Sequence, residues 1–166
     1  MRVLSDANMR QLLDMDEVIG AVEHGFAGLA SAACEAPVRL ALEPPSSADV
    51  VLYMPAYLED PVILGAKVVS VFPGNASRNK AVVLGTYLLH DPLTGALKAV
   101  MDAAHLTGIR TAAASAVATR HLARPDSATL GIIGAGVQAS YHIDALTRVL
   151  SFDRVLVCGR TKTRAE

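Results

Sequence analysis

The residues with the clearest chemical meaning form the glycine-rich run GAGVQA at 134–139. The run follows an apolar segment, ATLGII, and precedes a segment with helical spacing of apolar residues, so it fits the pattern G-x-G-x-x-A between a strand and a helix. In this pattern Gly134 permits a tight turn, and Gly136 lets the backbone approach a diphosphate closely. N–H groups at the start of the helix then face the phosphates. We predict a dinucleotide-binding turn, and the alternative is a glycine turn that serves packing alone.

The end of the next expected strand, in RVLVCGRTKTR, bears on which dinucleotide would bind. An NAD site commonly has Asp or Glu at this point to accept hydrogen bonds from the ribose 2′-OH. This chain instead has Gly159, Arg160 and Thr161, followed by Lys162 and Arg164. A guanidinium can bind a 2′-phosphate through two hydrogen bonds, whereas a carboxylate would repel it. We therefore favour NADP(H) over NAD(H), and the alternative is that Arg160 is only a surface charge.

Three cations and an amide earlier in the chain could bind a small substrate. Lys67 lies among apolar residues in LGAKVVSVF. In a cleft its pKa would fall and it could transfer protons near neutral pH, whereas on an edge strand it would only face solvent. Arg110, in LTGIRTAAAS, is expected in the first turn of a helix, where a bound anion such as a substrate carboxylate would offset the unfavourable helix dipole. A salt bridge to Asp or Glu is the alternative. Arg39, in APVRLAL, could give a second carboxylate contact or be an ordinary strand charge, and Asn75, in FPGNAS, could contact substrate or complete a turn.

The spacing of apolar residues predicts the elements that must position these groups. A helix is expected at 14–32 with Asp14 or Asp16 as its N-cap, and a second helix at 105–123 with Thr107 as its N-cap. Strands are expected at 38–43, 50–58, 62–72, 82–91 and 97–103. Short turns separate these strands, including an Asp-Pro turn in HDPLTGALKAV, so we predict a largely antiparallel or mixed sheet. Beyond a break near Arg124, a strand at 128–134, a helix at 138–150 and a strand at 154–160 are expected.

Composition narrows the classes of function. The chain has 166 residues, is 52% apolar and carries a formal net charge of −1, so a nucleic-acid or membrane-surface role has no electrostatic support. No apolar run approaches 18 residues, and the N-terminus lacks the apolar core of a signal peptide. The two cysteines are far apart, and neither they nor the five histidines have the spacing of metal ligands. We expect a cytoplasmic protein without a metal site.

Several motifs in order resemble one enzyme family. They are LGAKVVSVFPGN, then GTYLLHDPLTGALKAVMDAAHLTGIRTAAASAVATRHLA, then LGIIGAGVQA. Together they resemble the ornithine cyclodeaminase/mu-crystallin family. The resemblance implies an α/β fold in two parts. Residues 1–124 would form an α+β substrate-binding and dimerisation domain with a mixed sheet. Residues 125–166 would be the incomplete start of a Rossmann domain that binds NAD(P).

The resemblance also implies roles for the site residues. Arg39 and Arg110 would hold the α-carboxylate of the substrate, Lys67 would assist proton transfer, and Asn75 is counted among the substrate-binding residues. The predicted cofactor-binding residues are Thr111, Gly134, Gly136, Val137, Gln138, Arg160 and Thr161. The implied chemistry is hydride transfer at the α-carbon of a small amino or imino acid, as in ketimine reductases, alanine dehydrogenases and ornithine cyclodeaminases.

Two features depart from the strict cyclodeaminase pattern. The segment SVFPGN is more similar to the reductase and alanine dehydrogenase branches, because cyclodeaminases tend to have a histidine before this proline. The family's acidic catalytic residue and later Rossmann strands would lie beyond residue 166. We therefore expect a fragment that holds at most the adenosine and diphosphate end of the cofactor. The alternative function is a catalytically incomplete module for ligand binding or dimerisation. A homodimer is expected because sheet edges need cover and the family dimerises through its first domain.

Overall fold

The computed structural model describes residues 1–160. The predicted cofactor residue Thr161, together with Lys162 and Arg164, falls outside the described residues. The chain divides into two compact units, one formed by Met1–Leu12 and Gly25–Thr107, the other by Leu13–His24 and the residues from Gly108 on. The predicted domain boundary at residues 124 and 125 stays a prediction.

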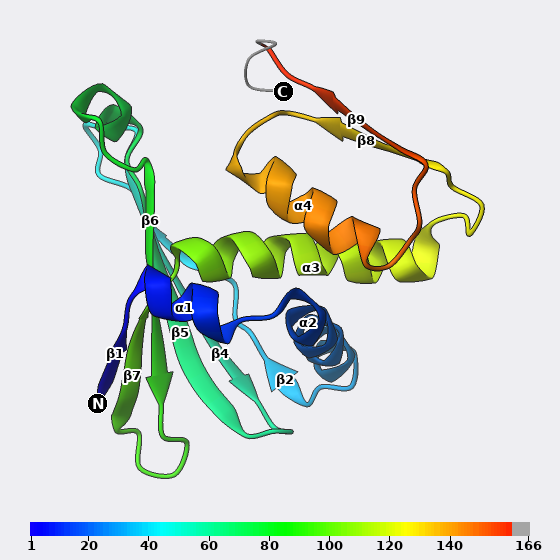
Figure 1. The fold of residues 1–166 in the computed structure, drawn as a ribbon. Coiled ribbons are helices and arrows are strands. Elements are labelled where there is room, and N and C mark those ends of the chain that lie inside the picture. Colours follow the sequence, from blue (N-terminus) through cyan, green and yellow to red (C-terminus); the bar gives the residue numbers. More distant parts are fainter. Residues whose placement is uncertain (161–166) are drawn as a thin grey trace. The chain divides into compact units, whose positions relative to one another are not determined.

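The first unit is built on a seven-stranded mixed sheet, shown in Figure 1. Its strands are β1 (Arg2–Leu4), β2 (Cys34–Glu35), β3 (Leu40–Leu42), β4 (Val50–Leu58), β5 (Ile63–Val71), β6 (Val83–His90) and β7 (Leu97–Asp102). The order is β1-β7-β6-β5-β4-β2, with β3 also paired to β4. The pairing of β1 with β7 is parallel, and the other pairs are antiparallel. The predicted mixed sheet is confirmed.

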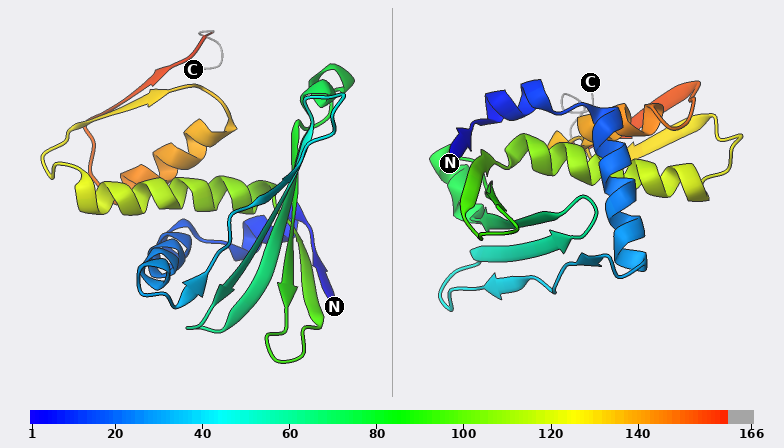
Figure 2. Two further views of the ribbon diagram at one scale, coloured as in Figure 1. Left: turned by 180° about the vertical axis from the view of Figure 1, so that it is seen from behind. Right: turned by 90° about the horizontal axis from the view of Figure 1, so that it is seen from below.

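Turn chemistry sets the two hairpins around β6. Between β6 and β7, the carboxylate Oδ1 of Asp91 accepts hydrogen bonds from the N–H groups of Leu93 and Thr94, each at 3.0 Å. Gly95 closes this turn with a φ of +71°, a conformation that favours glycine. Between β5 and β6, the chain forms the 3-10 helix η1 (Pro73–Arg78), which Figures 1 and 2 show at the tip of that hairpin. The turn at Asp91 confirms the predicted Asp-Pro hairpin between β6 and β7.

Helix α3 (Ala104–Leu122) begins earlier than predicted. The Oδ1 atom of Asp102, the last residue of β7, accepts a hydrogen bond from the N–H of Ala104 at 2.8 Å. Asp6, in helix α1 (Asp6–Leu12), accepts another from the N–H of His105 at 3.1 Å. The prediction of Thr107 as the N-cap is wrong, because these two carboxylates already satisfy the amides that a cap must satisfy.

The second unit contains a strand–helix–strand segment. It comprises β8 (Thr129–Ile133), α4 (Val137–Thr147) and β9 (Arg154–Cys158). β8 and β9 are parallel and in register along their whole length, with Gly131 opposite Leu156. Parallel strand–helix–strand segments of this kind are the units from which doubly wound dinucleotide-binding folds are built, and the sequence predicts one here. Helix α4 ends at Thr147, three residues before the predicted end.

The core of the second unit is formed by α2 (Met15–Ala30), α3 and α4. Only the parts of α2 and α3 that belong to this unit contribute to it. Its buried apolar residues are Met15, Val18, Ile19, Ile109, Ala112, Ala113, Ala116, Val117, Ala145 and Leu146. Asp14 caps α2 as predicted, because its Oδ1 accepts from the N–H of Asp16 at 2.9 Å. The predicted apolar face of α2 is buried only in its first half, since Phe26 and Leu29 are 49% and 47% exposed.

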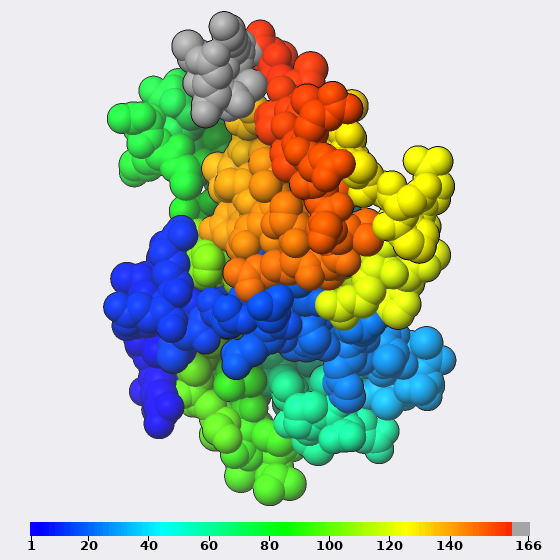
Figure 3. Space-filling model, turned by 45° about the vertical axis from the view of Figure 1, so that its right-hand side comes forward, coloured from blue at the N-terminus to red at the C-terminus, as the bar shows by residue number. Residues whose placement is uncertain are grey.

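Ion pairs link the helices of this unit at its surface. Glu23 of α2 bonds His121 at 2.6 Å and Arg120 at 2.7 Å, both at the end of α3. The hydrogen bond from His121, with the charge of Arg120, lowers the pKa of the Glu23 carboxyl below its ordinary value. Arg148, just after α4, pairs with Asp16 of α2. Figure 3 shows the surface that α4 and β9 form, in orange and red.

Candidate functional site

The glycine turn between β8 and α4 combines a positive φ with a helix start that has no side-chain cap. Gly134 has a φ of +109°, a region that side chains disfavour, and its N–H donates to the carbonyl of Cys158 on β9 at 2.7 Å. Gly136 is the N-cap residue of α4, and within the described residues no side chain caps this helix. The amides of its first turn therefore lack a side-chain acceptor, which is the arrangement of an anion site at a helix N-terminus.

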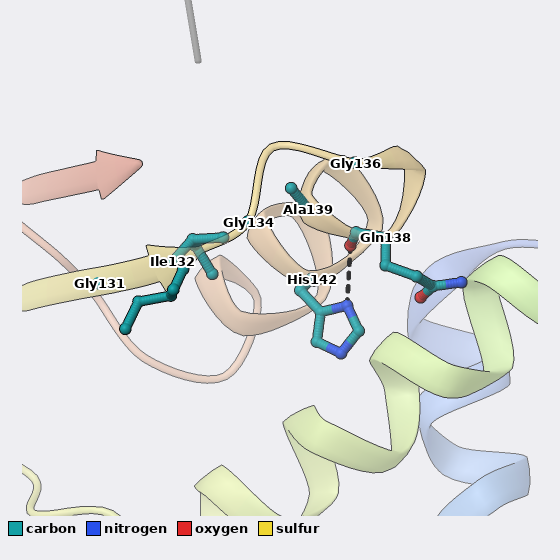
Figure 4. Close-up of a pocket in the computed structure, with 8 residues that line it drawn as sticks. Gly131, Ile132, Gly134, Gly136, Gln138, Ala139 and His142 are labelled. Carbon is teal, nitrogen blue, oxygen red and sulfur yellow. Dashed lines mark hydrogen bonds between the residues drawn. The ribbon is translucent and has the colours of Figure 1, made fainter. Parts of the chain in front are cut away.

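Open space adjoins this turn. A Cβ atom added to Gly134 or Gly136 would meet no described atom within 4 Å. The cavity there has a volume of about 320 Å³, and Figure 4 shows its walls. It is lined by Gly131, Ile132, Ile133, Gly134, Gly136, Gln138, Ala139 and His142. The residues therefore fit a dinucleotide diphosphate, because bare backbone, an uncapped helix and room for a ligand occur at one place.

The other predicted cofactor residues lie on three elements. Val137 is the first residue of α4 and is 77% exposed. Arg160 follows β9 by two residues and is exposed. Thr111 is half-buried on α3. These positions leave each side chain at least partly accessible to a ligand, and the roles of all three stay predictions.

Lys67 is buried in the middle of the first unit's sheet. It lies on β5, between β4 and β6, and is 7% exposed, so the alternative of a solvent-facing lysine on an edge strand is wrong. Met54 and Tyr87 lie directly opposite it on the neighbouring strands, and Met101 lies opposite Tyr87 on β7. Residues opposite one another project from the same face of a sheet. These four side chains therefore form one row across the sheet.

The row lines a small apolar cavity. Its volume is about 270 Å³, and its walls are Met54, Ala56, Ile63, Gly65, Ala66, Lys67, Tyr87, Leu88, Leu89 and Met101. The ammonium Nζ of Lys67 lies 5.8 Å from the centroid of the Tyr87 ring, within the range of a cation–π interaction. Gly65 allows close approach of β5 and β6 at this point, since a Cβ there would come within 2.8 Å of the Leu88 carbonyl oxygen. The cavity thus presents one ammonium amid apolar walls.

Arg110 differs from the sequence expectation in a way that matters for its role. It is the seventh residue of α3, so the argument from the first turn of the helix is wrong. Its Nε is buried and has no hydrogen-bond partner among residues 1–160, and no salt bridge of the described chain includes it. A buried donor without an acceptor is costly, and an anionic ligand would remove that cost. The buried Nε therefore replaces the helix-dipole argument as the reason to expect an anion at Arg110.

The remaining two candidates lie outside the walls of both cavities. Arg39 is exposed and lies immediately before β3 instead of within a strand. Asn75 is buried in η1, and its side-chain Nδ2 donates to the carbonyl of Ala81 at 2.9 Å. That bond completes the turn, which is the structural role that the sequence left open. A substrate role for Arg39 and Asn75 stays a prediction.

Sequence reasoning missed several residues of these cavities. Tyr87, Met54 and Met101 meet Lys67 only through strand register, which cannot be read from a local pattern. His142 could have been found, because a position four residues after Gln138 lies on the same face of a helix. Within the described part of the chain, no group of three or more His, Cys, Asp or Glu could hold a metal ion. Nor does any described helix have the length and apolar character needed to cross a membrane.

Comparison with known proteins extends these observations. A Delta(1)-pyrroline-2-carboxylate reductase of Bacillus cereus is 36% identical over 165 residues, which are 99% of this chain and 51% of the relative. The structure of Thermococcus litoralis Delta(1)-pyrroline-2-carboxylate reductase in complex with NADH and L-proline matches with a TM-score of 0.94 at 42% identity. The match covers 99% of this chain and 51% of that chain. An archaeal alanine dehydrogenase dimer with bound NAD matches with a TM-score of 0.94 at 33% identity, over 99% and 50%.

This chain therefore spans about half the length of the relatives it matches. The two related structures hold NADH or NAD, and each match takes in both the mixed sheet and the glycine turn of this chain. The profile of one family matches residues 1–166. The chain belongs to the ornithine cyclodeaminase/mu-crystallin family.

Proposed function

We propose that this protein takes part in NAD(P)-dependent hydride transfer at the α-carbon of a small amino or imino acid. The open, uncapped glycine turn before α4 is the observation that carries this proposal. The relatives that hold NADH or NAD in their solved structures support it. When bound, the dinucleotide would supply or accept the hydride.

The backbone of the glycine turn would bind the diphosphate. Gly134 and Gly136 let the phosphates approach, and the N–H groups of Val137 and Gln138 would donate to them. Thr111 would contribute from α3. We propose residues 1–124 as the substrate-binding and dimerisation domain, and residues 125–166 as the first part of the dinucleotide domain.

A preference for NADP(H) is the finer part of the proposal. Arg160 is exposed two residues after β9, where NAD sites commonly have an acidic residue. Its guanidinium would bind the 2′-phosphate, and we propose Thr161 as a further contact to the cofactor. Titrations should show tighter binding of NADPH than of NADH, and Arg160→Ala should remove the difference. Equal affinities in the unaltered protein would contradict this preference.

The substrate would be recognised by positively charged side chains and by the apolar cavity at Lys67. Arg110 and Arg39 would hold the α-carboxylate, Asn75 would assist them, and Lys67 would transfer a proton. Among the described residues, the walls of the Lys67 cavity include no acidic side chain. An ammonium on the substrate's side chain would have no carboxylate to pair with among these described walls, which favours compact, uncharged side chains. This feature supports ketimine reductase or alanine dehydrogenase chemistry over cyclisation of a diamino acid.

Dimer formation through the first unit is also proposed. Leu40, Leu42, Tyr53 and Leu84 are each at least 42% exposed. The register places them on one face of the sheet, the face opposite Lys67. A contiguous apolar face of this kind usually marks a protein interface. Light scattering at micromolar concentration should give the mass of a dimer, and the mass of one chain would contradict the proposal.

Turnover assays test the function as a whole. We expect oxidation of NADPH in the presence of a cyclic ketimine, or reduction of NADP⁺ with L-alanine, and we expect Lys67→Met to lower both activities by about 100-fold or more. Lack of turnover with every such pair, combined with retained dimerisation, would instead support a module that binds ligand or dimerises without catalysis.

A further inference from the structure

His142 forms a polar bridge beneath the glycine turn. Its Nδ1 lies 2.8 Å from the carbonyl oxygen of Gln138, one turn earlier in α4, and its Nε2 lies 3.1 Å from the hydroxyl of Ser115 on α3. Figure 4 shows the ring under the first turn of α4, with the bond to Gln138 drawn. The bridge therefore joins the first turn of α4 to a second helix of the same unit.

The carbonyl partner fixes the Nδ1 proton of the bridge. A carbonyl oxygen only accepts, so Nδ1 must carry a proton. In the neutral ring Nε2 is then the acceptor, and the Ser115 hydroxyl donates to it. Both ring nitrogens are engaged by protein groups, which holds the imidazole in one orientation.

The position of the ring links it to the dinucleotide site. His142 is one of the residues that line the cavity beside the glycine turn. Gln138, to which it is bonded, belongs to the first turn of α4, the turn that has no side-chain cap in the described chain. Since residues 136–138 are exposed, a bond to a neighbouring helix adds a contact that holds this start of α4 in place.

Helix α3 is a suitable anchor. Next to Ser115, Ala116 is fully buried, as are Ala112 and Ala113 one turn earlier. At a second point of contact, Tyr141 of α4 lies so close to Gly108 of α3 that an added Cβ would come within 2.4 Å of its ring. The side of α4 that bears Tyr141 and His142 thus packs against the partly buried helix α3.

We propose that His142 is a positioning residue for the diphosphate-binding turn. Through Gln138 on one side and Ser115 on the other, it fixes the first turn of α4 so that its amides converge on the phosphates. Preorganised groups bind more tightly because they lose less freedom on binding. This inference rests on the proposed dinucleotide binding.

Titration of NADH and NADPH by fluorescence, with melting curves recorded in parallel, tests the bridge. His142→Ala and Ser115→Ala should each weaken binding about three- to tenfold, as expected for one lost hydrogen bond. The double variant should be no weaker than either single variant, because both changes break the same bridge. His142→Gln, which can return a polar nitrogen near the Nε2 position, should recover part of the affinity.

Thr147→Val is the matched control. Its hydroxyl bonds the carbonyl of Ile143 at 2.8 Å at the other end of α4, so its loss perturbs the same helix far from the turn. This variant should bind the dinucleotides as the unaltered protein does. Ser115→Ala removes one hydroxyl only, and it keeps the test valid if His142→Ala does not fold.

The outcomes separate the two proposals. Unaltered affinity in both His142→Ala and Ser115→Ala would overturn the bridge while leaving dinucleotide binding intact. Additive losses in the double variant, or an equal loss in Thr147→Val, would also overturn it. Absence of NADH and NADPH binding by the unaltered protein would overturn the proposed function and this inference with it.

Discussion

The substitution Gly136→Ala can separate an effect on dinucleotide binding from an effect on folding stability. Its φ of −93° and ψ of −176° lie in the extended region that alanine adopts without strain. A Cβ at this position would meet no described atom within 4 Å. Gly136→Ala should therefore fold normally, because the gain of about 0.4–1 kcal/mol from the lost freedom of the unfolded chain offsets the poorer N-cap that alanine makes.

The same methyl group should damage dinucleotide binding. It would occupy the open space beside the uncapped start of α4, where the phosphates must approach the amides of Val137 and Gln138. A hydrogen bond to a charged group contributes about 1.5–3 kcal/mol. Losing one such bond would weaken NAD(P)H binding by about 10- to 100-fold, since about 1.4 kcal/mol corresponds to a factor of ten.

The assay is a pair of measurements on one preparation of each variant. Thermal unfolding followed by circular dichroism should show no loss of stability for Gly136→Ala, while NADPH fluorescence should show the loss of affinity. Gly134→Ala is the comparison, because its φ of +109° should cost about 1–2 kcal/mol of folding stability in an alanine. Wild-type affinity in Gly136→Ala would refute the assignment of this turn to the diphosphate.

Four further changes have defined outcomes. Gly108→Ala should destabilise the protein by about 1–3 kcal/mol in a thermal melt, because the added methyl would overlap an aromatic ring of α4; an unchanged melting temperature would contradict that packing. Lys67→Met should retain the fold, since the cavity is apolar, yet lower kcat/KM by about 100-fold or more; activity within tenfold of the unaltered enzyme would argue against a role in proton transfer. Arg110→Met should leave the melting temperature unchanged or raise it, because a buried Nε without a partner is removed. The KM for the substrate should rise at least about tenfold, and a loss of stability with unchanged KM would indicate a structural role. Main-chain and hydroxyl hydrogen bonds lower the pKa of Asp91 below its ordinary value of 3.8, so its contribution to stability is present above that pH and lost as the pH falls through the lowered pKa. Asp91→Asn should therefore show a smaller drop in melting temperature between about pH 4 and pH 2 than the unaltered protein, and equal drops would contradict this role.

The parts of the fold that local patterns predict are the long strands and helices. The strand predicted at 50–58 coincides with β4, and β5, β6 and β7 lie within one residue of their predicted bounds at each end. Alternating apolar residues and strong turn signals such as the Asp91 turn are local, so the sequence displays them. Strand β1 was missed because its three residues are defined by parallel pairing with β7, which is far along the chain.

In the candidate site, too, features set by consecutive residues could be predicted and features set by distant contacts could not. The glycine turn was predictable because its function depends on a few consecutive residues. The start of α3 was not, because the competing cap at Asp102 lies at the end of a strand, and Asp6 reaches α3 from the far end of the sequence. The cavity at Lys67 could not be predicted either, since its walls meet through the register of four strands.

A crystal structure of the protein with NADPH tests the central claim most directly. The account predicts diphosphate oxygens within hydrogen-bond distance of the main-chain nitrogens of Val137 and Gln138, in the cavity beside Gly136. A dinucleotide bound elsewhere, with this turn filled by solvent alone, would contradict it.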